Sequence, residues 1–340
     1  MAVQLTPITV AICVPVRNEA LLLPRLLEAI AAQAQADALT LRLFFDDCRD
    51  DSADIVAQHA ASMPFRIVSK TGGATAEPNA GRARAQAMTI GLDACGDAAV
   101  LLSTDADSIP APDWVARNLA ALDLADLVCG RIVRGGELPS AIQDRVEAYY
   151  DGLFALRRAI DPVPWEAPHT HHYTSGASLA VRAGTYRALG GFEPRASAED
   201  ARFVDAAHAA GLRVRRDAAV CVETSSRRHG RAAAGLADHL RGLDGGATGP
   251  TMAHPADEAW RYRGQARARA AWGDAAAVDR LAVALGRDAA HIRAVARTSA
   301  NAEAFAMRVI GEVPGGARLA TLDEAERALA NLTFERSAAA

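Results

Sequence analysis

The stretch AVLLSTDAD, residues 99–107, decides the fold of this chain. Its continuous apolar run is typical of a strand buried on both faces of a sheet, and two carboxylates, Asp105 and Asp107, follow directly. Open α/β sheets bind ligands in the crevice beyond the carboxyl ends of their strands. Two carboxylates there suit a hard cation that brings substrate phosphates with it. Turn chemistry, with a cap for a helix starting near Asp113, is the alternative that the tripeptide leaves open.

Strand-like and helix-like segments alternate along the first hundred residues. Continuous β-rich runs lie at residues 8–14, 41–47 and 65–69. Segments with helical spacing lie between and after them, at residues 21–36, 52–62 and 81–96. Strands alternating with helices imply a parallel sheet with right-handed crossovers. We therefore expect an α/β fold.

The pattern changes after the first hundred residues. Residues 127–133 and 213–225 are predicted strands, and residues 139–160 a long helix. From Leu243 onward a linker-like stretch leads into Ala/Arg-rich helices with no strand signal. We predict a working domain over residues 1–242 and a linker with a helical appendage over residues 243–340. The appendage is expected to pack on the working domain or on a second copy of the chain, as in a homo-oligomer.

Composition narrows the class of protein. The 340 residues carry a net charge of −4, so there is no basic excess to indicate a nucleic-acid partner. The five scattered cysteines fit a reducing compartment. No run reaches the roughly 18–20 apolar residues that a membrane span needs, and the N-terminus lacks the pattern of a signal peptide. We expect a soluble, cytoplasmic protein.

Six segments in order resemble the family-two glycosyltransferases with the GT-A fold. They are VPVRNE (14–19), FFDDCRDDS (44–52), GRARAQAM (81–88), STDADS (103–108), TSGASLAVRAGTYRALGGFE (174–193) and AED (198–200). The resemblance covers residues 8–231. It implies a Rossmann-like, mostly parallel sheet flanked by helices. It also implies transfer of a sugar from a nucleoside diphosphate sugar, UDP- or GDP-linked, to a hydroxyl acceptor, with inversion favoured.

The nucleoside side of the expected site lies in the first three segments. Pro15 stiffens the backbone after the first strand, and the resemblance makes Pro15 and Glu19 nucleoside contacts. The family's nucleoside-binding aspartate falls at Asp46 or Asp47, and we favour Asp46; the CRDDS version departs from the commoner GSTD one. Arg84 near a helix start suits an anionic nucleotide.

Two other residues of the segment GRARAQAM are expected to have roles different from that of Arg84. Arg82 lies two residues before Arg84, so it is expected to point away into solvent. Gly81 lets the backbone come close.

The resemblance also implies a divalent cation, Mn²⁺ or Mg²⁺, that bridges the diphosphate and acts as a Lewis acid on the leaving group. Asp107 is the expected direct ligand, and Asp105 reaches the ribose or the metal through water. His229 is a candidate further ligand, with an ordinary polar role as its alternative. Arg228 and Arg231 would suit the diphosphate.

Catalysis is expected at a helix start. The base of the family's Glu-Asp motif maps onto Asp200, next to Glu199, and it would take the proton of the acceptor hydroxyl. Plain helix-start placement of acids is the alternative. Ser175 and Gly176 match the acceptor-side loop. Trp165 lies in a His-rich loop that could cover the acceptor, or be ordinary surface.

Two other classes of function remain open at this point. A nucleotidyltransferase also combines a parallel sheet with metal-binding acids, but it would want a Gly-rich basic loop after the first strand, where this chain has PVRNE. A non-catalytic nucleotide-sugar or protein-binding module is the other alternative, which intact Asp107 and Asp200 disfavour.

Overall fold

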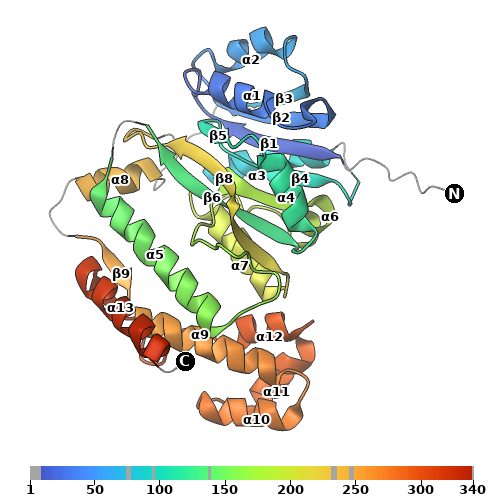
Figure 1. Cartoon of the computed structure of the whole chain (residues 1–340). Helices are drawn as coiled ribbons and strands as arrows, with labels where there is room; N and C mark the ends of the chain where they lie inside the picture. Colours follow the sequence, from blue (N-terminus) through green and yellow to red (C-terminus); the bar gives the residue numbers. More distant parts are fainter. Residues whose placement is uncertain are drawn as a thin grey trace. The chain divides into compact units, whose positions relative to one another are not determined.

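The computed structural model describes residues 9–73, 78–93, 96–136, 139–230, 236–244 and 249–338. The chain forms two compact units, whose elements are labelled in Figure 1. The sheet unit comprises Met1–Pro139, Tyr173–Val204 and Arg215–His239, and the helical unit comprises Ser140–His172, Asp205–Val214 and Leu240–Ala340. The sequence predicts one boundary after residue 242, whereas the two units alternate along the chain.

The sheet unit is built on eight strands in the order β3-β2-β1-β4-β7-β6-β8-β5. Their bounds are β1 Val10–Val16, β2 Leu39–Asp46, β3 Arg66–Gly72, β4 Val100–Ser103, β5 Ser108–Pro110, β6 Leu127–Gly135, β7 Leu179–Arg182 and β8 Val214–Ser225. The pairs β1–β2, β2–β3 and β1–β4 are parallel. The pairs β4–β7, β6–β7 and β5–β8 are antiparallel. The predicted α/β class is confirmed.

Strand β5 is a sheet element near the site that the sequence analysis missed. It has three residues directly after Asp107, and it pairs with the end of β8. A strand of three residues is too short to show an alternating pattern. The pairing joins the loop that carries the acidic pair to the segment that follows β8.

Helices flank this sheet because each presents an apolar face to it. Within the sheet unit these are α1 Leu23–Ala31, α2 Ser52–Ala60, α3 Ala80–Leu92, α4 Trp114–Leu122 and α6 Ala183–Ala188, with a short 3-10 turn η1 at Ala36–Ala38. On α1 the fully buried residues Leu23, Leu26 and Leu27 share one face, as the spacing of three and four residues requires. They pack in one core cluster with Ile12 and Val14 of β1.

Helix α3 starts where its sequence predicts. The side chain of Asn79 accepts a hydrogen bond from the main-chain N–H of Arg82 across 2.8 Å and so caps the helix. At Gly81 a Cβ atom would lie 2.3 Å from the carbonyl oxygen of Glu193. Main chain around Glu193 therefore comes close at Gly81, where a larger residue would not fit. This contact fixes the helix that carries Arg82 and Arg84.

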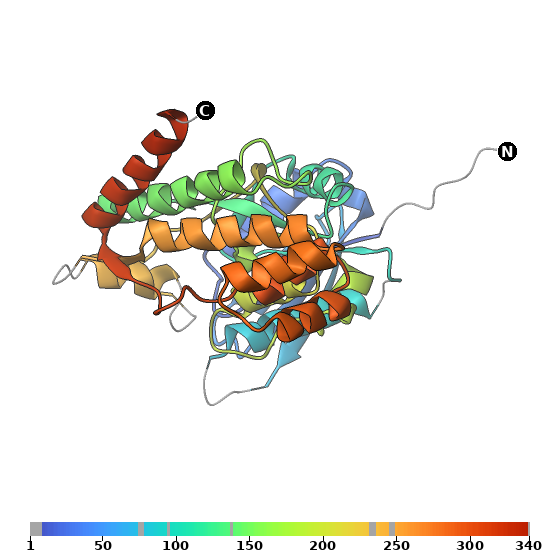
Figure 2. The same ribbon diagram turned by 90° about the horizontal axis from the view of Figure 1, so that it is seen from below.

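The helical unit contains α5 Ala141–Ile160, α9 Pro255–Ala271, α10 Ala275–Ala284, α11 Ala289–Thr298, α12 Ala302–Val309 and α13 Leu322–Ala338. Helices α5 and α9 lie side by side in both views (Figures 1 and 2). Val146, Tyr149 and Leu153 of α5 form a core with residues from the end of the chain, namely Met252, Ala320, Leu322 and Ala325. The predicted long helix thus belongs to the helical unit.

The end of the chain is not purely helical. Two short strands, β9 Thr251–Ala253 and β10 Leu319–Thr321, pair antiparallel. The expectation of a region without strands is wrong, because three-residue strands leave no periodic signal. Two further helices, α7 Glu199–Ala209 and α8 Leu236–Asp244, have residues in both units. In the described part of the chain, every helix is too short or too polar to cross a bilayer.

Candidate active site

A cavity of about 530 Å³ opens in the sheet unit at the carboxyl ends of β1, β2 and β4. Its size is that of a typical small-ligand site. The predicted residues that line it are Pro15, Glu19, Asp46, Arg84, Asp105, Asp107, Ser175, Glu199 and Asp200. These residues are separated by up to 185 positions in the sequence, yet they face one space. The structure therefore brings most of the predicted site together.

Other predicted residues lie elsewhere. Among the described residues, Asp47, Gly176, Arg228 and His229 do not line this cavity. His229 is exposed, and Arg228 donates to the carbonyl oxygen of Ser226 across 2.8 Å. Arg231 falls outside the described residues, and Trp165 belongs to the helical unit.

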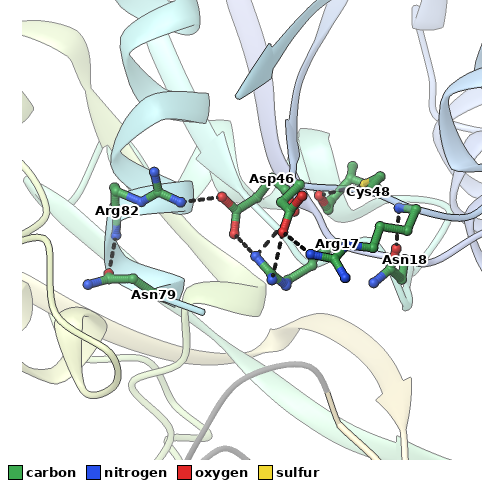
Figure 3. Close-up of polar contacts among 9 residues, drawn as sticks. Arg17, Asn18, Asp46, Cys48, Asn79 and Arg82 are labelled. Carbon is green, nitrogen blue, oxygen red and sulfur yellow. Dashed lines mark hydrogen bonds and ion pairs between the residues drawn. The ribbon is translucent and has the colours of Figure 1, made fainter. Parts of the chain in front are cut away.

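Asp46 holds two arginines at one end of the cavity (Figure 3). It is 2% exposed at the end of β2. Its Oδ2 accepts from Nη1 of Arg17 across 2.9 Å, and its Oδ1 accepts from Nη2 of Arg82. The expectation that Arg82 points into solvent is wrong, because α3 directs it at a buried carboxylate. These two ion pairs still leave lone pairs on the carboxylate of Asp46 that can accept from a third donor.

Arg17 is a site residue that the sequence analysis missed. It lines the cavity and also contacts Asp47, with 3.4 Å between Nη2 and Oδ2. The loops that follow β1 and β2 are further joined by Asn18, whose side chain accepts from the main-chain N–H of Arg49 across 2.7 Å (Figure 3). Asn18 and Asp47 have φ values of 53° and 48°, a left-handed conformation that Asn and Asp tolerate well. The position of Arg17 inside VPVRNE was the available signal.

The acidic pair after β4 is also bound by arginines. Nη1 of Arg84 lies 3.0 Å from Oδ1 of Asp105, and Nη2 of Arg227 lies 3.1 Å from Oδ2 of Asp107. Burial, and next the charge of Asp105, raise the pKa of Asp107 to about 7, although Arg227 acts to lower it. A carboxyl with this pKa is poised to exchange a proton for a cation near neutral pH.

The oxygen ligands that Asp105 and Asp107 offer after β4 suit a cation that is held largely by its substrate. Within the described ranges, no three His, Cys, Asp or Glu side chains gather closely enough to hold a metal alone. Asp107 and Asp105 both line the cavity and offer oxygen ligands. Mg²⁺-type ions commonly use one or two carboxylates and complete their shell with substrate phosphates and water. The residues Asp105 and Asp107 therefore fit a cation that is bound to a diphosphate. His229, the other candidate ligand, does not line the cavity.

Arg84 connects the acidic pair to the predicted catalytic helix. The side chain is buried, and its Nε donates to Oε1 of Glu199 across 3.0 Å. Its Nη1 donates to Oγ of Ser103 and to the carbonyl oxygen of Gly176, across 3.1 and 3.0 Å. Burial alone would lower the pKa of Arg84, but the charges of Asp105 and Glu199 raise it. Arg84 lines the cavity, and its guanidinium is held by Asp105, Glu199 and Gly176.

Asp200 faces the cavity through a different contact. The main-chain N–H of Gly176 donates to its Oδ2 across 2.9 Å, and Gly176 begins the 3-10 turn η2 Gly176–Ser178. Ala198, just before the helix, has a φ of 60°, which costs an alanine roughly 1–3 kcal/mol. Glu199 is 3% exposed and is held by Arg84, so the two adjacent acids have separate surroundings.

Comparison with known proteins agrees with this geometry. The sequence profile of glycosyl transferase family 2 matches residues 11–183, more than half of the 340-residue chain. The chain belongs to this glycosyltransferase family, and its α/β sheet with an acidic crevice is of the GT-A type. No curated protein matches the sequence.

Solved structures that are similar to this chain include two in complex with a nucleotide sugar. The mannosyltransferase PcManGT from Pyrobaculum calidifontis, in complex with GDP-Man and Mn²⁺, is 19% identical with a TM-score of 0.49, over 90% of this chain and 89% of that one. TarS residues 1–349 from S. aureus, in complex with UDP-GlcNAc, is 15% identical with a TM-score of 0.48, over 82% and 72%.

Proposed function

We propose that this chain transfers a sugar from a nucleoside diphosphate sugar to a hydroxyl acceptor, with a divalent cation and with inversion at the anomeric carbon. One observation carries the proposal: the acidic pair Asp105 and Asp107 and the carboxylate of Asp200 line the same cavity of about 530 Å³. The acidic pair suits the cation that would bind the leaving diphosphate, and Asp200 suits the hydroxyl of an acceptor. Family membership supplies the class of reaction.

The donor would lie between the ends of β2 and β4. Asp46 is proposed to accept a hydrogen bond from a ring N–H of the base, with Arg17 and Pro15 beside it in the cavity lining. Asp107 would hold the cation directly and Asp105 would reach it through water or contact the ribose. When bound, the cation would neutralise charge on the leaving diphosphate.

Asp200 is the proposed general base. It takes the proton of the acceptor hydroxyl while that oxygen bonds to the anomeric carbon and the bond from that carbon to the phosphate oxygen breaks. Glu199 is a poor candidate because Arg84 holds its carboxylate in a buried ion pair. Ser175, at the start of η2, lines the cavity on the same side and would face the acceptor.

The test is incubation with a panel of UDP- and GDP-sugars and Mn²⁺, with nucleoside diphosphate and pyrophosphate both measured. Release of nucleoside diphosphate that depends on an acceptor supports the proposal. Pyrophosphate formed from a nucleoside triphosphate would support a nucleotidyltransferase instead. Binding without turnover on every acceptor would support a binding module. Asp107→Ala should abolish Mn²⁺-dependent donor binding in calorimetry while the circular dichroism spectrum stays unchanged.

A further inference from the structure

Arg227 joins two acidic residues that come from separate strand ends. Glu19 follows β1 and Asp107 follows β4, and Arg227 is two residues past the end of β8. Both terminal nitrogens of Arg227 contact the carboxylate of Glu19, with 2.7 Å between Nη1 and Oε2. Nη2 also lies 3.1 Å from Oδ2 of Asp107. All three side chains line the cavity.

Glu19 is a fixed anchor for this contact. It is 6% exposed, and its main-chain N–H donates to Oγ of Ser52 across 2.8 Å. Its two carboxylate oxygens are both used by Arg227, which is the bidentate geometry in which a guanidinium binds most firmly. The side chain of Arg227 is 26% exposed, so it can be reached from the cavity. Arg227 is thus held beside Asp107 before any ligand enters.

A guanidinium at this distance opposes a free divalent ion. It occupies one oxygen of the proposed metal ligand, and it is a positive charge within a few ångströms of the place where the ion must bind. Charges this close interact strongly in a partly buried site. A nucleoside diphosphate changes the balance, because its phosphate oxygens bind both the ion and a guanidinium.

We infer that Arg227 is a clasp that closes Asp107 to free divalent cations and opens onto the donor diphosphate, so that the cation enters together with the nucleotide. This inference rests on the proposed function. It assigns Arg227 two opposite effects, one that weakens binding of the free ion and one that strengthens binding of the nucleotide. An ion pair with a purely structural role would not strengthen binding of the nucleotide.

The test is calorimetric titration of the full chain with Mn²⁺ alone, and then with UDP or GDP in the presence of Mn²⁺. Arg227→Met should bind Mn²⁺ alone about tenfold or more tightly than wild type, since a neighbouring like charge is removed. The same variant should bind the preferred nucleoside diphosphate about tenfold or more weakly, since a charge-assisted contact is lost. Arg227→Lys keeps the charge and should resemble wild type in the first titration.

Arg228→Met is the matched control, because Arg228 is the next residue and contacts the carbonyl oxygen of Ser226. Its Mn²⁺ affinity should stay within about twofold of wild type. Arg227→Gln gives the same reading if the methionine variant does not fold. Unchanged or weaker Mn²⁺ binding in a folded, uncharged Arg227 variant overturns the clasp. Asp107→Ala distinguishes a failure of this inference from a failure of the proposed function. If this variant leaves Mn²⁺ binding intact, the proposed metal site itself is wrong.

Discussion

The main-chain N–H of Gly176 donates to Oδ2 of Asp200 across 2.9 Å, while the carbonyl oxygen of the same glycine accepts from Arg84. One residue, Gly176, therefore links the proposed base to the arginine that holds Asp105. The orientation of Asp200 depends on this glycine. Gly176 also binds the arginine that pairs with Glu199, so it helps to keep the two acids in different surroundings.

Replacement of the base should affect chemistry more than binding. Asp200→Asn keeps the side-chain size and removes its basicity, and a general base acts only as the transition state forms. We expect a donor Kd near that of wild type and a kcat lower by roughly 10²–10⁴-fold. Steady-state kinetics with the true acceptor, together with calorimetry of the donor, checks both values.

Glu199→Gln is the control for this prediction. It breaks a buried ion pair with Arg84, so it should lower the melting temperature, and its kcat should fall less than that of Asp200→Asn. An inactive Glu199→Gln beside an active Asp200→Asn would show that the roles are reversed. Full turnover in both variants would mean that this helix start holds no base.

The space at Gly176 makes a second prediction. A Cβ atom there would lie 2.2 Å from Cζ of Arg84, which is buried and cannot move aside cheaply. Gly176→Ala should therefore lower kcat by about tenfold or more, since small displacements of catalytic groups are costly. Gly73→Ala is the matched control, because nothing lies within 4 Å of a Cβ at that position. Equal kcat values for the two variants would contradict the positioning role.

Asp107 should make cation binding depend on pH. Its pKa is raised to about 7, so below that pH a proton competes with the ion for the carboxylate. Calorimetry should show the Mn²⁺ association constant falling by about tenfold for each pH unit below about 7. A flat profile between pH 5 and 7 would mean that this carboxyl is not the ligand.

The same shift fixes the sign of a stability effect. The folded-state pKa lies above the usual 3.8, so the folded state holds the proton more tightly and stability is lost as pH rises from about 4 to about 7. Without metal, Asp107→Asn should raise the melting temperature more at pH 8 than at pH 5. The gain in the free energy of unfolding at pH 8 is at most about 4 kcal/mol, at about 1.4 kcal/mol for each pKa unit.

Asp46→Ala should weaken binding of the free nucleoside by as large a factor as it weakens binding of the whole donor, because the lost contact is to the base. Calorimetry with uridine or guanosine and with the sugar nucleotide gives the two factors. Asp47→Ala, at a residue outside the cavity lining, should change both much less. A loss confined to the sugar-bearing ligand would place Asp46 elsewhere in the donor site.

The alternation of the two units predicts how truncation behaves. A chain of residues 1–242 keeps α5 but loses Met252, Ala320 and Leu322, which cover Val146 and Tyr149. We expect it to aggregate or to bind a hydrophobic dye, as measured by light scattering and fluorescence. Serine at Val146, Tyr149 and Leu153 should restore the solubility of this shortened chain. A soluble, cooperatively unfolding chain without those changes would contradict the interleaved units.

The sequence by itself determined the longer strands of the sheet and the place of the acids that follow them. A buried parallel strand is a continuous apolar run, and the residues after it lie at the ligand-binding edge whatever the rest of the chain does. Asp105 and Asp107 were found on that ground, and Asp46, Asp200 and Ser175 from the resemblance of their motifs.

Only the tertiary structure decided which charges meet. Arg17 and Asp46 are 29 positions apart, Arg82 and Asp46 are 36 apart, and Arg227 and Glu19 are 208 apart. An arginine in a loop can reach several carboxylates, and its partner depends on loop paths that no local pattern encodes. The same reason left Arg227 unnoticed beside Arg228, and left α5 in the wrong unit. Both outcomes depend on long-range packing, which a periodic sequence pattern does not specify.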